Sequence, residues 1–416
     1  MSNHITDLYK MKALTEKYSE NISKGLSLPA GKLVKDMGFG ILASGSCILS
    51  EISRSLNETI TVKKTEERLS RGLNKLGENE SLLDNLAPLV KPLVGMVPVF
   101  LCDGSDLAKP CGKAFEGLSR VHDGSTGEIT KGYWTLEISA LSEKSHTPIP
   151  VYDRVYSTLE KGFVSQNAEL FKGLQKVREL YGNTGVFVHD RGYDGNKIYE
   201  HFFKNNMTFL IRANRDRDVI HKNKRLNILA AAEKYKGKCA LKFKGFSLKT
   251  SLVPVSLPAF PGKNLTMVTV YGLGDEPLML LTNYASNADK LSNLIAKLYL
   301  LRWRIEENFR FKKQSFGIEN FRALSLRSIR ALHRMAMLAT AFVAILSAQR
   351  EEKAIVARLV MLSKPIFEPT WTKFCKMFLH YAIASAISWL FARSRDALCR
   401  KLPKLRLSAQ LVFPGY

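Results

Sequence analysis

The chain has 416 residues, of which 62 are Lys or Arg and 38 are Asp or Glu, so its formal net charge is +24 and its pI is about 9.7. With 45% hydrophobic residues it has enough apolar material for a core, which excludes wholesale disorder. No apolar run reaches ~18–20 residues and the N-terminus lacks a signal-peptide segment, so we expect a soluble, intracellular protein without a membrane span.

A positive charge of this size requires an anionic partner. Lys and Arg residues run through every region of the chain, whereas proteins that bind membrane surfaces usually concentrate them in one basic helix or tail. Nucleic acid is therefore the favoured partner, and an anionic membrane surface is the alternative.

The cysteines predict neither a disulfide framework nor a zinc site. None of the six belongs to a C-x-x-C pair, and no His lies at zinc-ligand spacing from two of them. We expect reduced thiols, as in a cytoplasmic protein, at Cys47, Cys102, Cys111, Cys239, Cys375 and Cys399.

Residues 1–85 are predicted to be helical, most clearly at 64–76. Leu69, Leu73 and Leu76 form an apolar stripe at helical spacing. A second, basic stripe on another face consists of Lys64, Arg68, Arg71 and Lys75. Such a stripe either contacts DNA or is a solvated surface, and the sequence leaves both interpretations open.

From residue 93 the pattern changes to short apolar strands that alternate with helices. Residues 97–102 predict a buried strand that feeds a turn at 103–106. Further strands are predicted at 134–141, 149–156, 186–189 and 208–212, with helices around 170–177 and 195–206. This order predicts a mixed α/β sheet with helices packed against it.

Residues 213–290 interrupt that plan. They open with basic, polar residues and continue with alternating apolar and basic positions, as in Leu241 to Lys244, which is typical of half-exposed strands with one positive face. No Ser/Gly/Pro-rich linker bounds the segment, so it is predicted to be a β-rich insertion within one fold. Residues 288–315 and most of the remaining chain are predicted to be helical.

One helical face in this region carries side chains that could bind a metal ion or contact phosphate. At ~100° per residue, a continuous helix puts Tyr299, Arg302, Glu306 and Lys313 within one sector about 60° wide. A single carboxylate flanked by a phenol and two cations suits a metal ligand placed beside a nucleic-acid backbone.

Asp103 and Asp190 are the natural companions of Glu306, because each directly follows an apolar strand. Functional groups gather at strand ends in α/β sheets, and three close carboxylates repel unless divalent cations neutralise them. Oxygen-only ligation favours Mg²⁺ or Mn²⁺. An isolated Asp at a strand end is more often a turn or cap residue, and Asp106 and Asp194 lie close enough to be confused with the active ones.

The sequence resembles the DDE transposases of insertion-sequence family four, a cut-and-paste group within the RNase-H-like superfamily. The family signature is Tyr, two residues, Arg, three residues, Glu, six residues and Lys, and Tyr299, Arg302, Glu306 and Lys313 match every gap. Residues 100–109, FLCDGSDLAK, resemble its first acidic motif and residues 186–194, VFVHDRGYD, its second.

The resemblance implies an RNase-H-like catalytic core with helical regions on either side. The predicted domains are a DNA-binding region at 1–85, a catalytic domain at 93–350 with its β-rich insertion at 213–290, and a helical C-terminal region at 351–416 that is a candidate for dimerisation. Family members bind the terminal inverted repeats of their element as a homodimer, cleave the DNA ends and join the 3′-OH groups to target DNA. A hairpin step is left open.

The resemblance also assigns the residues. Asp103, Asp190 and Glu306 would be catalytic and hold two Mg²⁺ ions, with Mn²⁺ able to substitute. Residues expected to contact double-stranded DNA are Tyr299, Arg302, Lys313, Arg212, Trp303, Arg68 and Arg71. Trp303 either stacks on a base or packs within the protein, and packing is favoured.

No nucleotide cofactor or membrane partner is expected, and the implied location is the bacterial cytoplasm beside the nucleoid. Two alternatives remain, an inactive repurposed transposase that only binds DNA, and a host nuclease on the same fold.

Overall fold

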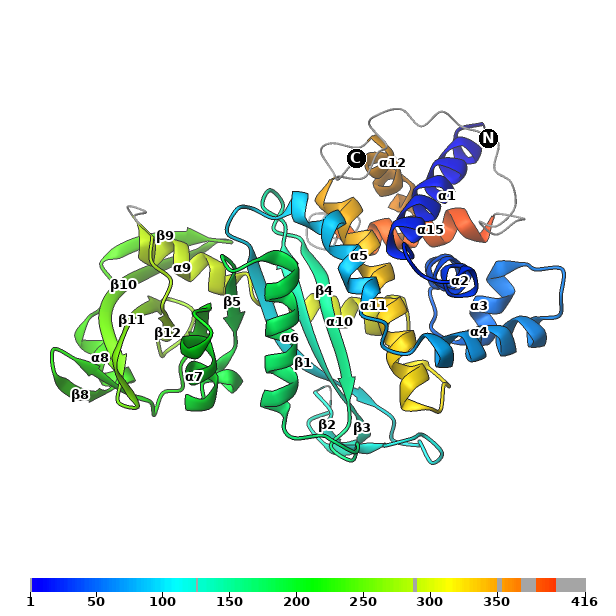
Figure 1. Cartoon of the computed structure of the whole chain (residues 1–416). Coiled ribbons are helices and arrows are strands. Elements are labelled where there is room, and N and C mark those ends of the chain that lie inside the picture. The colour runs from blue at the N-terminus through cyan, green and yellow to red at the C-terminus, as the bar shows by residue number, and fades with distance from the viewer. Residues whose placement is uncertain (1, 125, 287–289, 350–353, 368–378, 394–416) are drawn as a thin grey trace. The chain divides into compact units, whose positions relative to one another are not determined.

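The computed structural model describes residues 2–124, 126–286, 290–349, 354–367 and 379–393 (Figure 1). The chain forms two compact units, the first built from Met1–Gly95, Gly104–Leu180 and Glu307–Tyr416, the second from Met96–Asp103 and Tyr181–Glu306. Of the predicted C-terminal region, residues 351–353, 368–378 and 394–416 lie outside the described residues. The architecture is mixed α/β, as predicted, with helices before and after the strand-rich part of the chain.

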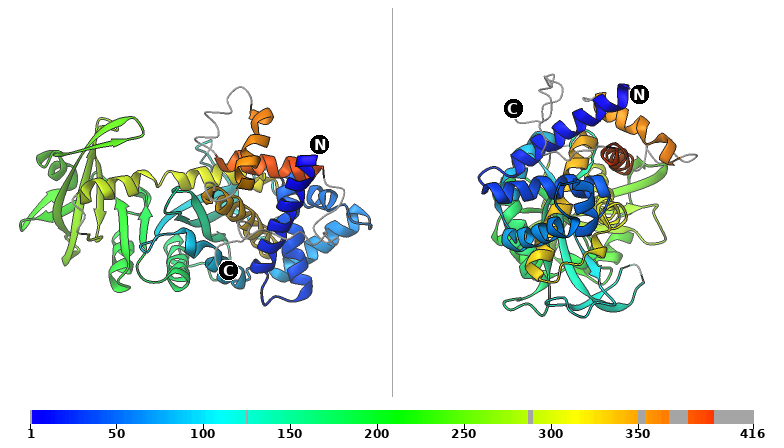
Figure 2. Two further views of the ribbon diagram at one scale, coloured as in Figure 1. Left: turned by 90° about the horizontal axis from the view of Figure 1, so that it is seen from above. Right: turned by 90° about the vertical axis from the view of Figure 1, so that its right-hand side faces the viewer.

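Helices from both ends of the chain form one bundle in the first unit (Figures 1 and 2). α11 contacts α2, α4 and α15 there, and the Tyr18 hydroxyl donates to the Leu338 carbonyl at 2.8 Å. The helices are α1 (Ser2–Ile22), α2 (Leu28–Ser44), α3 (Leu49–Leu56), α4 (Val62–Leu76), α5 (Ser81–Val90), α11 (Leu326–Ala348), α12 (Ala354–Leu362), α13 (Lys364–Phe367) and α15 (Leu379–Ala392).

α11 is the longest of these helices, with 23 residues. Within the described chain it is the single helix long and apolar enough to cross a membrane, and 94% of its apolar window is buried inside the protein. α2 and α3 pass the same test only as a pair bent by 97°. Burial on all sides explains why α11 lacks the polar face of a surface helix.

Three antiparallel strands complete the first unit. They are β2 (Ser119–His122), β3 (Ile129–Leu141) and β4 (Pro148–Tyr156), with β3 between the other two. α6 (Gln166–Tyr181) lies close to them, since a Cβ added at Gly173 would stand 2.8 Å from the Tyr152 ring. The last residues of β1 (Val99–Ala108) run beside β3, where the Thr135 hydroxyl donates to the Ser105 carbonyl at 3.1 Å.

The second unit is a mixed sheet. The first residues of β1 pair in parallel with β5 (Val186–His189), and β5 pairs in parallel with β6 (Thr208–Arg212). Antiparallel strands follow in the order β12 (Leu278–Thr282), β11 (Phe260–Tyr271), β10 (Phe246–Leu257), β7 (Asp218–His221) and β8 (Lys224–Asn227), and β9 (Cys239–Phe243) pairs with β10. The helices are α7 (Asn196–Lys204), α8 (Ile228–Lys234), α9 (Leu291–Leu300) and the start of α10 (Arg304–Ser315).

Two local predictions are wrong. Residues 103–106 do not form a turn but lie inside β1, because this stretch runs beside β3, and the Lys109 N–H just beyond it donates to the Lys131 carbonyl at 2.7 Å. The predicted continuous helix is interrupted between Leu300 and Arg304. There the N–H groups of Arg302 and Ile305 donate to carbonyls three residues back, which is the tighter 3₁₀ pattern.

A buried ion pair fixes α10 in the first unit. Lys312 on α10 and Glu137 on β3 are paired, and their side chains are 2% and 0% exposed. Glu137→Gln keeps the shape but leaves the Lys312 ammonium without a charged partner. We expect a loss of about 3–5 kcal/mol of unfolding free energy, the usual result of breaking a buried pair, measured by urea unfolding. Glu200→Gln, which breaks the exposed pair with Lys204, is the matched control and should leave the unfolding free energy nearly unchanged. Equal losses in both variants would contradict the prediction.

Candidate active site

Parallel strands bring the first two predicted carboxylates together. Val99 pairs with Val186 and Leu101 with Val188, so Asp103 and Asp190 each follow the last paired residue of their strand by two positions. Neighbouring strands are ~4.8 Å apart, which keeps the two residues adjacent. Asp190 ends β5 as predicted, and its carboxylate accepts the Gly192 N–H at 2.8 Å to cap a short 3₁₀ turn.

The Arg302 guanidinium connects Asp103 to Glu306. It donates to Asp103 Oδ2 at 2.7 Å through Nη1 and to Glu306 Oε1 at 2.6 Å through Nη2. The Arg302 and Asp103 side chains are 14% and 16% exposed, whereas that of Glu306 is 50% exposed. Burial alone would lower the pKa of Arg302, but the two carboxylates hold it above its usual value. One cation is therefore shared by two of the three predicted metal ligands.

Tyr299 and Arg212 support this cation from the other side. The buried Tyr299 hydroxyl lies near the positive charges of both Arg302 and Arg212. Burial raises the pKa of Tyr299, and the two nearby arginines oppose that rise without cancelling it. Asp103 and four other predicted residues therefore lie together in the second unit: Arg302, Glu306, Tyr299 and Arg212.

The neighbouring His189 carries no charge at neutral pH. Complete burial and then the positive Arg302 lower its pKa to about 3. Its ring packs against Tyr193 and Phe202, and neither ring nitrogen has a hydrogen-bond partner among the described residues. Local charge balance therefore involves only the carboxylates and the arginines.

Lys313 and Trp303 are engaged within the protein. In the first unit, Lys313 Nζ lies 3.0 Å from Glu319 Oε1 and 3.4 Å from Asp106 Oδ2. In the second unit, Lys244 Nζ lies 4.0 Å from the centre of the half-buried Trp303 ring. Sequence reasoning missed Lys244, because only the turn between β9 and β10 brings it to Trp303. No local signal could have revealed that contact.

The two acids that could be confused with the active ones have structural contacts. The buried Asp194 accepts from the Tyr199 hydroxyl at 2.6 Å and the Asn214 N–H at 2.7 Å, and it pairs with Arg217. The buried Asp106 accepts the Gly124 N–H at 3.3 Å. These contacts support leaving both residues outside the candidate site.

The predicted basic stripe on α4 is divided. Leu69, Leu73 and Leu76 are buried, as predicted. Arg68 pairs with Asp36 at 2.7 Å and Glu58 at 2.9 Å, so its charge holds α4 to its neighbours. Arg71, by contrast, is exposed.

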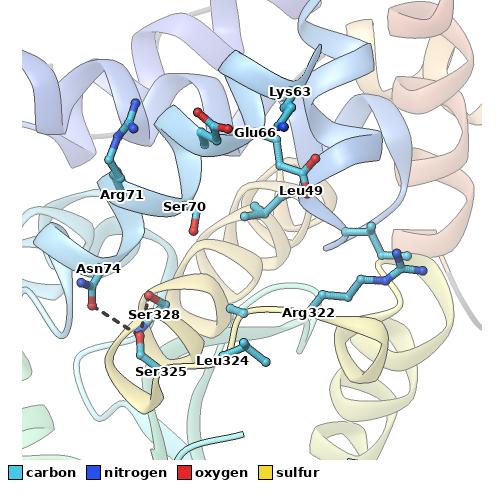
Figure 3. Close-up of a pocket in the computed structure, with 13 residues that line it drawn as sticks. Leu49, Lys63, Glu66, Ser70, Arg71, Asn74, Arg322, Leu324, Ser325 and Ser328 are labelled. Carbon is cyan, nitrogen blue, oxygen red and sulfur yellow. Dashed lines mark hydrogen bonds between the residues drawn. The ribbon is translucent and has the colours of Figure 1, made fainter. Parts of the chain in front are cut away.

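Arg71 lies on the wall of an open pocket of about 580 Å³ (Figure 3). At its base the Ser325 hydroxyl caps α11 and bonds to Asn74 and Ser328. The lining combines three cations with two acids, so the pocket is not uniformly positive: it consists of Ile48, Leu49, Lys63, Glu66, Glu67, Ser70, Arg71, Asn74, Arg322, Ala323, Leu324, Ser325 and Ser328.

Comparison with known proteins bears on the second unit most directly. Residues 164–342 match the transposase DDE domain. The matched segment contains Asp190, Arg302 and Glu306, whereas Asp103 lies before it. No curated protein matches the chain in sequence. Among solved structures, the chain is similar to the cryo-EM structure of the piggyBac transposase synaptic complex with hairpin DNA, with 13% identity and a TM-score of 0.43 over 97% of this chain and 83% of that chain.

DDE domains generally use divalent metal ions, and the residues here suit one. The donors are all carboxylate oxygens, which Mg²⁺ and Mn²⁺ prefer. A cation is already accommodated between Asp103 and Glu306, namely the Arg302 guanidinium. In the described part of the chain, however, no three carboxylate, His or Cys side chains meet as a complete metal site. A metal ion that used these oxygens would have to compete with Arg302.

Arg302→Gln tests this competition. Each partly exposed ion pair is worth about 0.5–1 kcal/mol, so displacing Arg302 costs an incoming ion ~1–2 kcal/mol, or about tenfold in affinity. The variant should bind Mn²⁺ about tenfold more tightly than the unchanged chain, measured by calorimetry without DNA. Arg310→Gln on α10, whose pair is with Glu307, is the control and should not change Mn²⁺ affinity. Equal or weaker Mn²⁺ binding by Arg302→Gln would show that Arg302 does not compete.

Proposed function

We propose that the chain is a DNA transposase of insertion-sequence family four, which cleaves the ends of its element by phosphodiester hydrolysis and joins the 3′-OH ends to target DNA. The observation that carries the proposal is the bridge from Asp103 through Arg302 to Glu306, beside Asp190 and largely within the segment that matches the transposase DDE domain.

Each side chain has a part in the proposed reaction. Asp103, Asp190 and Glu306 hold the divalent metal, two Mg²⁺ ions for which Mn²⁺ can substitute. When bound, the metal supplies Lewis-acid stabilisation of the phosphate oxygens and an activated water or 3′-OH. Arg302 exchanges its two carboxylates for phosphate oxygens, which the planar fork of a guanidinium also fits. Lys313 contacts a phosphate of the same DNA as a point charge.

Tyr299 and Arg212 act on Arg302. The buried phenol and the second cation lie beside the Arg302 guanidinium and limit where it can move, so it can change partners without leaving the site. Positioning of this kind can control the rate of a displacement at phosphorus more strongly than DNA affinity.

The same proposal specifies the partners. The terminal inverted repeats and the target site are double-stranded DNA, and two copies of the chain bridge the two ends as a homodimer. The reaction belongs in the bacterial cytoplasm, beside the nucleoid.

One observation favours a second candidate, a repurposed transposase that binds DNA without cutting it. The Arg302 guanidinium occupies oxygens of two carboxylates that a catalytic metal needs. If it never leaves them, the protein binds but does not cleave.

Asp190→Asn separates the candidates. DNA flanking the coding region supplies the repeats, and a plasmid carrying both ends is incubated with the protein in Mg²⁺. The unchanged chain should cleave at the repeats. The variant should lose at least about a hundredfold in rate, because a metal ligand is lost, while its affinity for end DNA stays within about twofold.

Asp216→Asn, which changes an exposed acid of the second unit, is the control and should cleave normally. Cleavage by Asp190→Asn at the control rate would refute the assignment. Specific end binding by the unchanged chain without any cleavage would favour the DNA-binding candidate.

A further inference from the structure

The β-rich insertion contains a stretch of one charge sign. Between Glu233 and Asp275 the sequence has seven lysines and no acidic residue or arginine. The chain as a whole has 38 acids for 62 bases, so the lack of acids is local. The lysines are Lys234, Lys236, Lys238, Lys242, Lys244, Lys249 and Lys263.

The hairpin of β9 and β10 (Figure 1) carries two of these lysines, Lys242 and Lys249. Lys242 pairs with Ser247 and Ala240 with Lys249, so these four residues share one face, and all four are exposed. The opposite face carries the buried Leu241, Leu248 and Thr250. α9 covers that face, where the Thr250 hydroxyl contacts Ser292 and Asn293 at 2.8 and 2.7 Å.

A close backbone approach adds two more lysines. The Lys238 N–H donates to the Thr250 carbonyl at 2.9 Å. A Cβ at Gly237 would lie 2.7 Å from the Lys249 carbonyl carbon, so only glycine lets this segment run directly against β10. Lys236 and Lys238 are both exposed. We call Lys236, Lys238, Lys242 and Lys249 the lysine face.

The ammonium groups of the lysine face are available to a partner. Within the described residues none of the four forms an ion pair. Two exposed lysines elsewhere do form ion pairs, Lys172 with Glu169 and Lys204 with Glu200, both at 2.7 Å. Four uncompensated charges on one side of a hairpin repel one another unless an anion lies against them.

We propose that the lysine face binds the phosphate backbone of duplex DNA without reading its sequence, an inference that rests on the proposed function for the identity of the partner. Lysine is a mobile point charge suited to single phosphates, whereas base recognition favours forked or amide side chains. Lys242 and Lys249 are diagonal neighbours on adjacent strands, ~7–8 Å apart, which is close to the axial span of two phosphate steps of one DNA strand.

The test is the salt dependence of DNA binding. A 30-base-pair duplex of arbitrary sequence is titrated with the full chain at several salt concentrations. Lys242→Gln with Lys249→Gln should lower the slope of log affinity against log salt by about 1.8, because each lost phosphate contact removes ~0.9. Lys242→Arg with Lys249→Arg should keep the slope of the unchanged chain.

The control removes the same charge elsewhere. Lys172→Gln with Lys204→Gln should leave the slope unchanged, and thermal melting checks that all variants are folded. An unchanged slope in the Lys242 and Lys249 double variant would overturn this proposal and leave the proposed function intact. No DNA binding by the unchanged chain would overturn both. Binding to phosphatidylserine vesicles that is lost in the double variant, with the DNA slope unchanged, would replace DNA by a membrane as the partner.

Discussion

The Arg302 guanidinium between Asp103 and Glu306 is the interaction on which the candidate site depends. Two carboxylates this close are stable only with a cation between them, and here the chain supplies that cation itself. Because Arg302 and Asp103 are mostly shielded from water, the attraction is weakly screened. The guanidinium binds carboxylate oxygens of the kind that a divalent ion prefers. The negative charge of Asp103 and Glu306 is therefore balanced by the chain itself.

The interrupted helix makes this bridge possible. The backbone between α9 and α10 tightens into 3₁₀-type hydrogen bonds at Arg302, Ile305 and Glu306. A 3₁₀ segment turns by ~120° per residue rather than ~100°, so side chains before and after it are rotated relative to an unbroken helix. Tyr299 is buried near Arg302 and Arg212, whereas the Glu306 side chain is 50% exposed. A break of this kind commonly marks a functional position in a helix.

Sequence alone predicted the elements whose pattern is local. The strands at 186–189 and 208–212 have the predicted bounds, because each is a short run with three consecutive apolar residues and polar residues close on both sides. The prediction failed where distant pairing decides the structure. Residues 103–106 read as a turn, yet β3 draws them into a strand.

The candidate site shows the same division. Spacing identified Tyr299, Arg302 and Glu306 as a set, and strand ends suggested Asp103 and Asp190. The shared guanidinium, however, forms only because β1 and the segment from Arg302 to Glu306 meet in space. Arg68 shows the converse, since its partners Asp36 and Glu58 lie far back in the chain. A stripe of basic residues therefore cannot reveal by itself which charges are already paired.

The candidate active site uses arginine and the lysine face uses lysine, which agrees with the different roles that we propose for the two sites. At the candidate active site the cation between the carboxylates is Arg302, a forked group that bonds to two partners at once and holds a fixed direction. In the lysine face every cation is a lysine on an exposed strand or its flank, free to follow a phosphate as it moves. Geometry must be exact to a fraction of an ångström where a bond is broken, whereas a surface that only carries DNA gains from tolerance. Exchanging the two residue types should therefore harm the first site and spare the second.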